Sequence, residues 1–121
     1  MSDTSLYSGL YKTIDEYSSL VDRVLLSISE DNASSVTDEQ KRLGSFLLGI
    51  AQSDTDNLST YMISQLLNET DELDDLDLAA AGRALQKGEI DTEIRRTIEQ
   101  FATVLDRERT KVMARIRGNR R

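Results

Sequence analysis

The spacing of apolar positions predicts a long helix at the start of the chain, over about residues 4–28. Apolar side chains recur there alternately three and four residues apart, the heptad spacing of a helix that packs against other helices. These positions are Tyr7, Leu10, Ile14, Tyr17, Val21, Val24 and Ile28. Leu6, Leu20 and Leu25 flank this seam and widen it, so we expect the helix to be buried in a bundle.

Polar breaks and caps divide the middle of the chain into shorter helices. Thr37 and Gln40 form a capping-box signature, which predicts a second helix after the polar residues 29–35. Its expected buried face is Leu43, Phe46, Leu47 and Ile50. Gly44 and Gly49 lie on the same helix, where they lower its intrinsic stability but permit close contact with another helix.

Two further short helices are expected before the last one. Residues 53–56 break the chain and are expected to cap the third helix. The apolar positions expected on that helix are Leu58, Tyr61, Met62, Gln65 and Leu66, with Ile63 and Leu67 alongside. The fourth is expected to begin at Thr70 or Asp71 and to run through Leu73, Leu76, Ala80 and Ala84. Lys87 and Gly88 suit its C-terminus, because a cation favours the last turn and glycine adopts the left-handed cap.

The last predicted helix is capped by Asp91 and reaches about Arg117, a length of about 40 Å at 1.5 Å per residue. Its apolar stripe is Ile94, Ile98, Phe101, Leu105, Val112 and Ile116. No alternating strand pattern of useful length is present. We therefore predict an all-α fold, an irregular antiparallel bundle of about five helices with long first and last helices. The bundle is expected to be a single helical domain over residues 1–121, from which the basic end at 107–121 projects.

The amino-acid composition removes most catalytic chemistry. The 121 residues include no proline, histidine, cysteine or tryptophan, although about six prolines would be expected at average usage. Without histidine or cysteine the chain has no Ser-His-Asp or Cys-His triad and no Cys/His metal or haem site. We expect no enzyme activity, no cofactor and no metal. No apolar run is long enough to span a membrane and no secretory signal is evident, so a cytoplasmic protein is expected.

The net charge of −7 is divided unevenly along the chain. Residues 1–82 hold sixteen Asp or Glu and four Lys or Arg, whereas residues 83–121 hold six and eleven. Such a division indicates either a basic segment that binds an acidic partner or nucleic acid, or complementary charges within one bundle.

The end of the last helix is the expected partner-binding surface. Seven cations fall within fifteen residues: Arg107, Arg109, Lys111, Arg115, Arg117, Arg120 and Arg121. At helical spacing Arg107, Lys111 and Arg115 form one stripe away from the apolar face, whereas Arg109 falls close to that face. Glu108 is the only local counter-charge that we expect. A partner protein is the first expectation, and nucleic acid remains possible through the same cations. Alternatively, the cations only stabilise the C-terminus of a helix.

An acidic surface in the middle of the chain supports a different hypothesis. Its carboxylates are Glu69, Asp71, Glu72, Asp74, Asp75 and Asp77. A small acidic inhibitor or nucleic-acid mimic would use them to occupy a basic groove. A magnesium site is a weaker alternative, because Glu69 and Glu72 form one E-x-x-E step without a second acidic pair at helical spacing. Self-association through the heptad seam of the first helix is a further possibility.

About the last thirty residues, which include Ile94-Arg95-Arg96 and Lys111-Val112-Met113, resemble the closing helix of the helical domain in GINS replication-complex subunits. The resemblance covers about a quarter of the chain. The Leu-Pro and Phe-Tyr features of that family are absent from the earlier part of this sequence. The resemblance implies a second alternative function, a subunit of a DNA-replication or transcription complex.

Overall fold

The all-α prediction is confirmed. A computed structural model describes residues 2–29, 37–52, 56–68, 73 and 76–118, with the backbone alone for residues 2–7 and 29. Within these ranges the chain forms five helices and no strand. The helices are α1 (Ser2–Ser29), α2 (Asp38–Ala51), α3 (Leu58–Leu67), α4 (Leu78–Lys87) and α5 (Thr92–Gly118).

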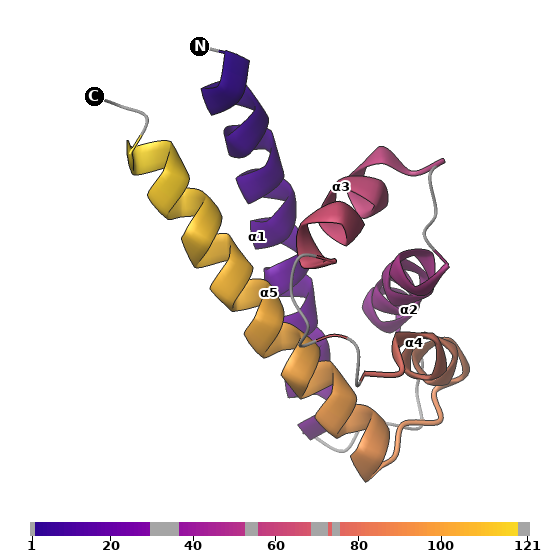
Figure 1. Cartoon of the computed structure of the whole chain (residues 1–121). Coiled ribbons are helices and arrows are strands. Elements are labelled where there is room, and N and C mark those ends of the chain that lie inside the picture. Colours follow the sequence, from indigo (N-terminus) through magenta and orange to yellow (C-terminus); the bar gives the residue numbers. More distant parts are fainter. Residues whose placement is uncertain (1, 30–36, 53–55, 69–72, 74–75, 119–121) are drawn as a thin grey trace.

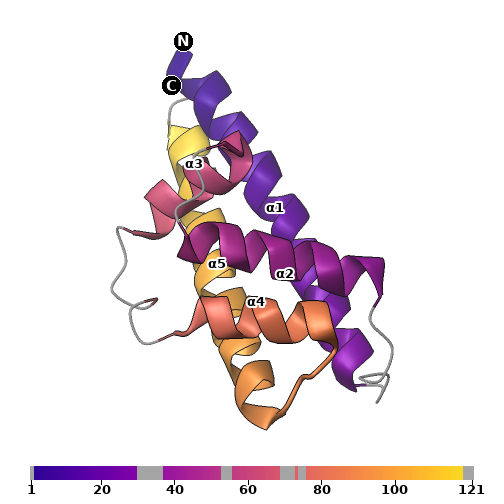
Figure 2. The same cartoon turned by 90° about the vertical axis from the view of Figure 1, so that its right-hand side faces the viewer.

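The two long helices form an antiparallel pair that carries the shorter helices on one side. Figure 1 shows α1 and α5 side by side, with both chain termini at the same end of the pair. Helices α2 and α4 lie next to each other and cross this pair, and α3 packs beside α2 (Figure 2). The end of the α1–α5 pair near the termini extends beyond α2 and α4 (Figure 1). The last helix therefore does not project alone, because α1 accompanies it.

The heptad seam of α1 lies in the core, as its spacing predicts. Its described apolar members are buried, apart from Tyr17, which is half-buried: Leu10, Ile14, Tyr17, Val21, Val24 and Ile28. Leu20 beside the seam is fully buried. The apolar stripe of α5 is also buried from Ile98 to Ile116. From Leu10 to Ile28, the seam that would serve self-association is thus largely covered by other helices of the same chain.

A chain of aromatic rings connects three helices. Phe46 of α2 stacks on Tyr17 of α1 with the ring centroids 3.8 Å apart, and its edge meets Phe101 of α5 at 6.2 Å. Arg42 of α2 lies 5.5 Å over the Tyr17 ring and pairs with Glu16 of α1. These contacts place α2 on the α1–α5 pair, because aromatic and cation–π geometry is directional as well as apolar.

Two glycines allow α2 and α4 to touch backbone to backbone. A Cβ on Gly44 would lie 2.7 Å from the carbonyl oxygen of Gly82, and a Cβ on Gly82 would lie 2.8 Å from that of Gly44. No side chain fits at either position without moving a helix backbone. The expected close approach at Gly44 is therefore confirmed, and its partner is Gly82.

Side chains cap the N-termini of four helices, α2 to α5. Thr37 Oγ1 accepts the Gln40 N–H at 3.2 Å, and Asp91 Oδ1 accepts the Ile94 N–H at 2.8 Å, both as predicted. The reciprocal half of the capping box is absent: the Gln40 amide points to Ser27 of α1 at 3.5 Å, and its buried Oε1 has no hydrogen-bond partner. Gly88 ends α4 in the predicted left-handed conformation, with φ of 75°.

The expected apolar positions of α3 are right only in part: Met62 and Leu66 are half-buried and pack against the core. Thr60, Ile63, Ser64 and Leu67 face the core. Leu58 is 70% exposed and Tyr61 39% exposed, and Gln65 is exposed as well. Both faces of this helix carry apolar side chains, so its apolar spacing alone could not select the buried one. Asn57, not a residue of 53–56, is its N-cap and accepts the Thr60 N–H.

The expected start of α4 is also wrong. The helix begins at Leu78, and Asp77 Oδ1 caps it by accepting the Ala80 N–H at 3.0 Å. Aspartate favours caps over helix interiors, because its short side chain bonds to nearby backbone N–H groups. The predicted caps Thr70 and Asp71 lie outside the described residues. The buried face is Leu78, Ala81, Gly82 and Leu85, while Ala80 and Ala84 are half-buried.

Replacing Gly44 or Gly82 with alanine should destabilise the fold. The added Cβ forces α2 and α4 apart, at a cost of about 1–3 kcal/mol for overpacking, more than the about 1 kcal/mol gained in helix propensity. Gly9→Ala is the matched control, because a Cβ at Gly9 meets nothing within 4 Å. Urea unfolding followed by circular dichroism should show Gly9→Ala unchanged or stabilised. An equal gain for Gly44→Ala would contradict the glycine contact.

The orientation of α3 can be tested with two alanine substitutions. Ile63 is fully buried, so Ile63→Ala should cost about 2–4 kcal/mol of unfolding free energy. Leu58→Ala should change it by no more than about 0.5 kcal/mol, because Leu58 is mostly exposed. The same unfolding measurement checks both, and the reverse order of effects would show that α3 is turned the other way.

Candidate partner-binding surface

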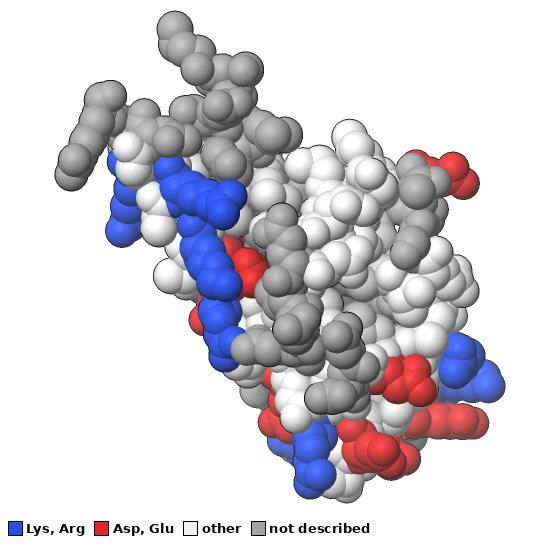
Figure 3. Space-filling view, viewed as in Figure 1, with Lys and Arg blue, Asp and Glu red and all other residues white. Residues whose placement is uncertain are grey.

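Three of the expected partner-binding cations form an exposed line along α5. Arg107, Lys111 and Arg115 are all exposed and lie four residues apart, so they span about 12 Å of the helix. We call these three residues the basic stripe. Figure 3 shows blue side chains running along α5 toward the end where the termini lie. Arg120 and Arg121 lie outside the described residues.

The basic stripe also has contacts within the molecule. Lys111 Nζ lies 3.2 Å from Glu108 Oε1, and the Glu108 residue is only 4% exposed. This confirms the local counter-charge that helical spacing indicates. Arg107 and Arg115 each have a polar, ring or electrostatic contact in the structure as well. The residues of the stripe are thus exposed to solvent and also make contacts within the molecule.

Arg109 joins α5 to α1. Its guanidinium donates to Asp15 of α1 at 2.8 Å and to Asp106 of its own helix at 2.6 Å. The hydrogen bond to Asp15 raises the pKa of Arg109 above its ordinary value, although desolvation acts in the opposite direction. Two carboxylates therefore share the charge of Arg109. It differs in this respect from the exposed stripe, in keeping with its expected place close to the apolar face.

Arg117 lies on the other flank of α5, beside a hollow against α1. The hollow has a volume of about 350 Å³ and is lined by Tyr11, Arg109, Thr110, Met113, Ala114 and Arg117. Tyr11 comes from α1 and the other residues from α5. Arg117 is exposed. The basic end of α5 thus presents cations on two flanks, with the small residues Thr110 and Ala114 between them.

Most residues of the alternative acidic surface lie outside the part of the chain that the structure describes. Glu69, Asp71, Glu72, Asp74 and Asp75 lie outside the described residues. Asp77, the remaining member, is exposed and caps α4. Among the described side chains, no group of three or more carboxylates is arranged to hold a metal ion. In the same part of the chain, no helix combines the length and apolar character needed to cross a membrane.

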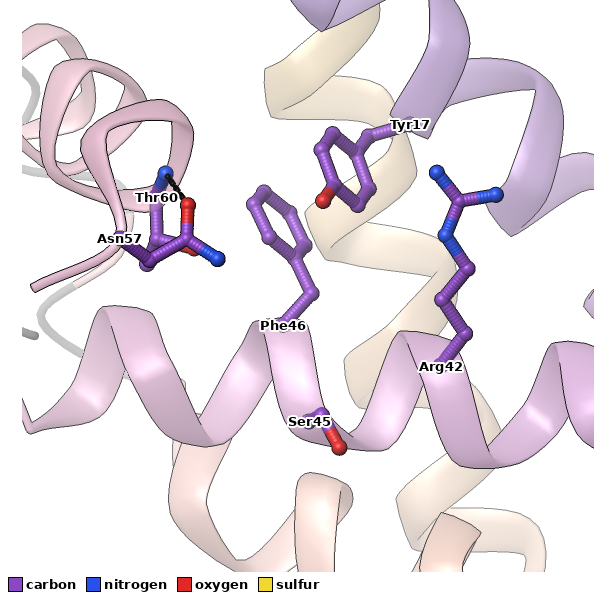
Figure 4. A pocket seen from close by; sticks show the side chains of 6 residues that line it. All are labelled: Tyr17, Arg42, Ser45, Phe46, Asn57 and Thr60. Carbon is purple, nitrogen blue, oxygen red and sulfur yellow. Dashed lines mark hydrogen bonds between the residues drawn. The ribbon is translucent and has the colours of Figure 1, made fainter.

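A second hollow lies where α1, α2 and α3 meet. Its volume is about 320 Å³, and its lining residues are Tyr17, Arg42, Ser45, Phe46, Asn57 and Thr60. Figure 4 shows the stacked Tyr17 and Phe46 rings between Arg42 on one side and Asn57 with Thr60 on the other. Arg42 pairs with Glu16 and Asn57 Oδ1 with Thr60, so the hollow's polar groups already serve the packing of the helices. The sequence analysis does not anticipate this hollow.

Sequence reasoning also missed the residues of α1 that complete the surface. Asp15 and Tyr11 lie about a hundred residues before their neighbours on α5, and neither stands out in its local spacing. The signal present in the sequence is the charge division, which indicates complementary charges within one bundle as one alternative. The Arg109–Asp15 pair is one such contact between the acidic and the basic part of the chain.

Breaking the Arg109–Asp15 pair should weaken the α1–α5 contact modestly. Arg109→Gln should lower the free energy of unfolding by about 0.5–1 kcal/mol, because partly exposed ion pairs contribute little. Combining it with Asp15→Asn in a double-mutant cycle should give a coupling energy that shrinks in molar salt. Arg117→Gln is the control, with almost no effect expected. A salt-independent coupling would contradict an electrostatic contact.

Comparisons with protein-family models, with curated proteins and with solved structures gave no match to this chain. The resemblance of the C-terminal segment to GINS subunits therefore rests on those residues alone. The function has to be argued from the surface just described.

Proposed function

We propose that the chain is a non-enzymatic helical adaptor or assembly subunit that binds an acidic surface of a partner protein through the basic stripe. The observation that carries this proposal is the exposed line of Arg107, Lys111 and Arg115 along one flank of α5. Cations held one helical turn apart attract a complementary row of carboxylates and fix its register. The basic half of α5 also lies at the end of the α1–α5 pair that extends beyond α2 and α4 (Figure 1).

An acidic protein is favoured over nucleic acid by the charge around the stripe. The whole chain has a net charge of −7, so a polyanion that covers more than the stripe meets repulsion. Asp106 and Asp15 lie next to the cations on the same end of the molecule. An acidic protein surface can place carboxylates opposite the stripe alone, whereas a nucleic acid carries a phosphate at every nucleotide.

The proposal is tested by reversing the stripe and comparing the result with an equal reversal elsewhere. Arg107→Glu, Lys111→Glu and Arg115→Glu should abolish capture of the partner from native lysate and leave helicity unchanged. The control reverses Lys41, Arg83 and Arg96, which are also exposed, and so gives the same net charge. Electrostatic complementarity predicts that wild-type capture weakens between low and high salt.

Nuclease treatment of the lysate separates the two partner classes. Proteins recovered by the wild type and the control after nuclease treatment, but not by the stripe variant, support the proposal. Recovery that depends on intact nucleic acid would move the function to nucleic-acid binding. Unaltered recovery by the stripe variant would overturn the proposal.

A further inference from the structure

We infer that the hollow between α1 and α5 is a docking groove for an acidic peptide segment of the partner, which inserts one apolar side chain beside its carboxylates. This inference rests on the proposed function and specifies the segment that the partner presents. The groove is the hollow of about 350 Å³ lined by Tyr11, Arg109, Thr110, Met113, Ala114 and Arg117.

The position of the groove suits a chain segment that crosses the two long helices. A volume of about 350 Å³ is at the lower end of the range for small-molecule sites. The groove lies at the end of the α1–α5 pair that α2 and α4 do not cover (Figure 1). A chain segment can therefore cross it while one residue enters the space between the helices.

The apolar part of the groove is built from half-buried side chains. Met113 of α5 and Tyr11 of α1 are both half-buried, although Val112 and Ile116 on the core side of α5 are fully covered. Methionine adapts its shape to an inserted group, and tyrosine offers an apolar ring with a polar tip. Ala114 is small enough to leave the space open. These side chains provide an apolar contact that a purely charged ligand does not use.

The charged part of the groove determines the sign of the charge that the ligand carries. Arg117 is exposed at one margin, and Arg109 is held by Asp15 and Asp106 with its side chain 33% exposed. An arginine that is already oriented loses little freedom when it receives a further carboxylate oxygen. Arg117 therefore attracts an anion to the groove, and Arg109 adds an oriented donor whose charge Asp15 and Asp106 already balance. The apolar contact beside them selects the residue next to that anion.

An acidic peptide fits this arrangement better than a nucleic-acid strand. Because Asp15 and Asp106 balance the charge of Arg109, little net positive charge remains beside the groove for a run of consecutive phosphates. A peptide alternates charged and apolar side chains, so that carboxylates meet Arg117 while the apolar side chain contacts Met113. The basic stripe lies on the opposite flank of the exposed surface of α5 and can bind further carboxylates of the same segment.

The test uses two labelled glutamate-rich peptides that differ at one central position, leucine in one and serine in the other. Fluorescence anisotropy should show that the wild-type chain binds the leucine peptide about tenfold more tightly, which corresponds to about 1.4 kcal/mol. Ala114→Trp fills the groove and should bring the ratio of the two affinities close to one. Thr103→Trp is the control, because Thr103 is exposed on α5 outside the groove, and it should leave the ratio unchanged.

Two further variants separate this inference from the proposed function. Arg117→Gln should weaken both peptides, and reversal of the basic stripe should weaken both without changing their ratio. If the wild type binds both peptides equally, or neither, the groove assignment is overturned, and the stripe is still tested independently by partner capture. The assignment of a peptide as ligand would be overturned by a single-stranded oligonucleotide that binds the wild type more tightly than either peptide and binds the Ala114→Trp variant more weakly.

Discussion

The arrangement of this bundle depends on the contact between Gly44 and Gly82. Each glycine has the carbonyl oxygen of the other less than 3 Å from where its Cβ would be, so α2 and α4 meet at a distance that no other residue type permits. The pair that they form crosses α1 and α5 as one unit and presents Phe46 to Tyr17 and Phe101. Because α2 and α4 cover only part of the length of α1 and α5, the end of the long pair near the termini is left uncovered by these two helices. The position of the candidate surface is thus a consequence of how closely two short helices pack.

The cations of α5 have two different roles, and helical spacing already separates Arg109, which lies close to the apolar face, from Arg107, Lys111 and Arg115. Arg109 faces α1 and is held by Asp15, so it contributes to the fold, whereas Lys111 is exposed beside the buried Glu108. The charge division along the chain therefore includes ion pairing within the bundle as well as exposed cations. Part of it is complementarity within the bundle, and part is a surface directed away from it.

Much of the fold could be predicted because the long helices are amphipathic on one side only. The apolar seam of α1 and the apolar positions of α5 each indicate a single buried face. Thr37, Gly88 and Asp91 mark helix ends through local hydrogen bonding and backbone geometry. Helix α3 has apolar side chains on both faces, so its orientation is decided by tertiary packing, which single-chain spacing does not contain. The start of α4 was misplaced because carboxylates in a first turn and carboxylates before a cap look alike in sequence. The groove was missed for a similar reason, since it needs Tyr11 and Met113 from opposite ends of the chain.

Arg109 connects the stability of the fold with the proposed binding. Its two carboxylate partners reduce the charge it offers to a ligand, but they also fix the guanidinium at the margin of the groove. A fixed donor contributes to affinity by lowering the entropy lost on binding, while a mobile one contributes by attraction at longer range. Arg117 and the basic stripe are exposed cations at this end, so they suit the attraction of an acidic segment. On this reasoning, Arg109 and the apolar side chains beside it determine which segment stays bound, and the exposed cations determine how fast it arrives.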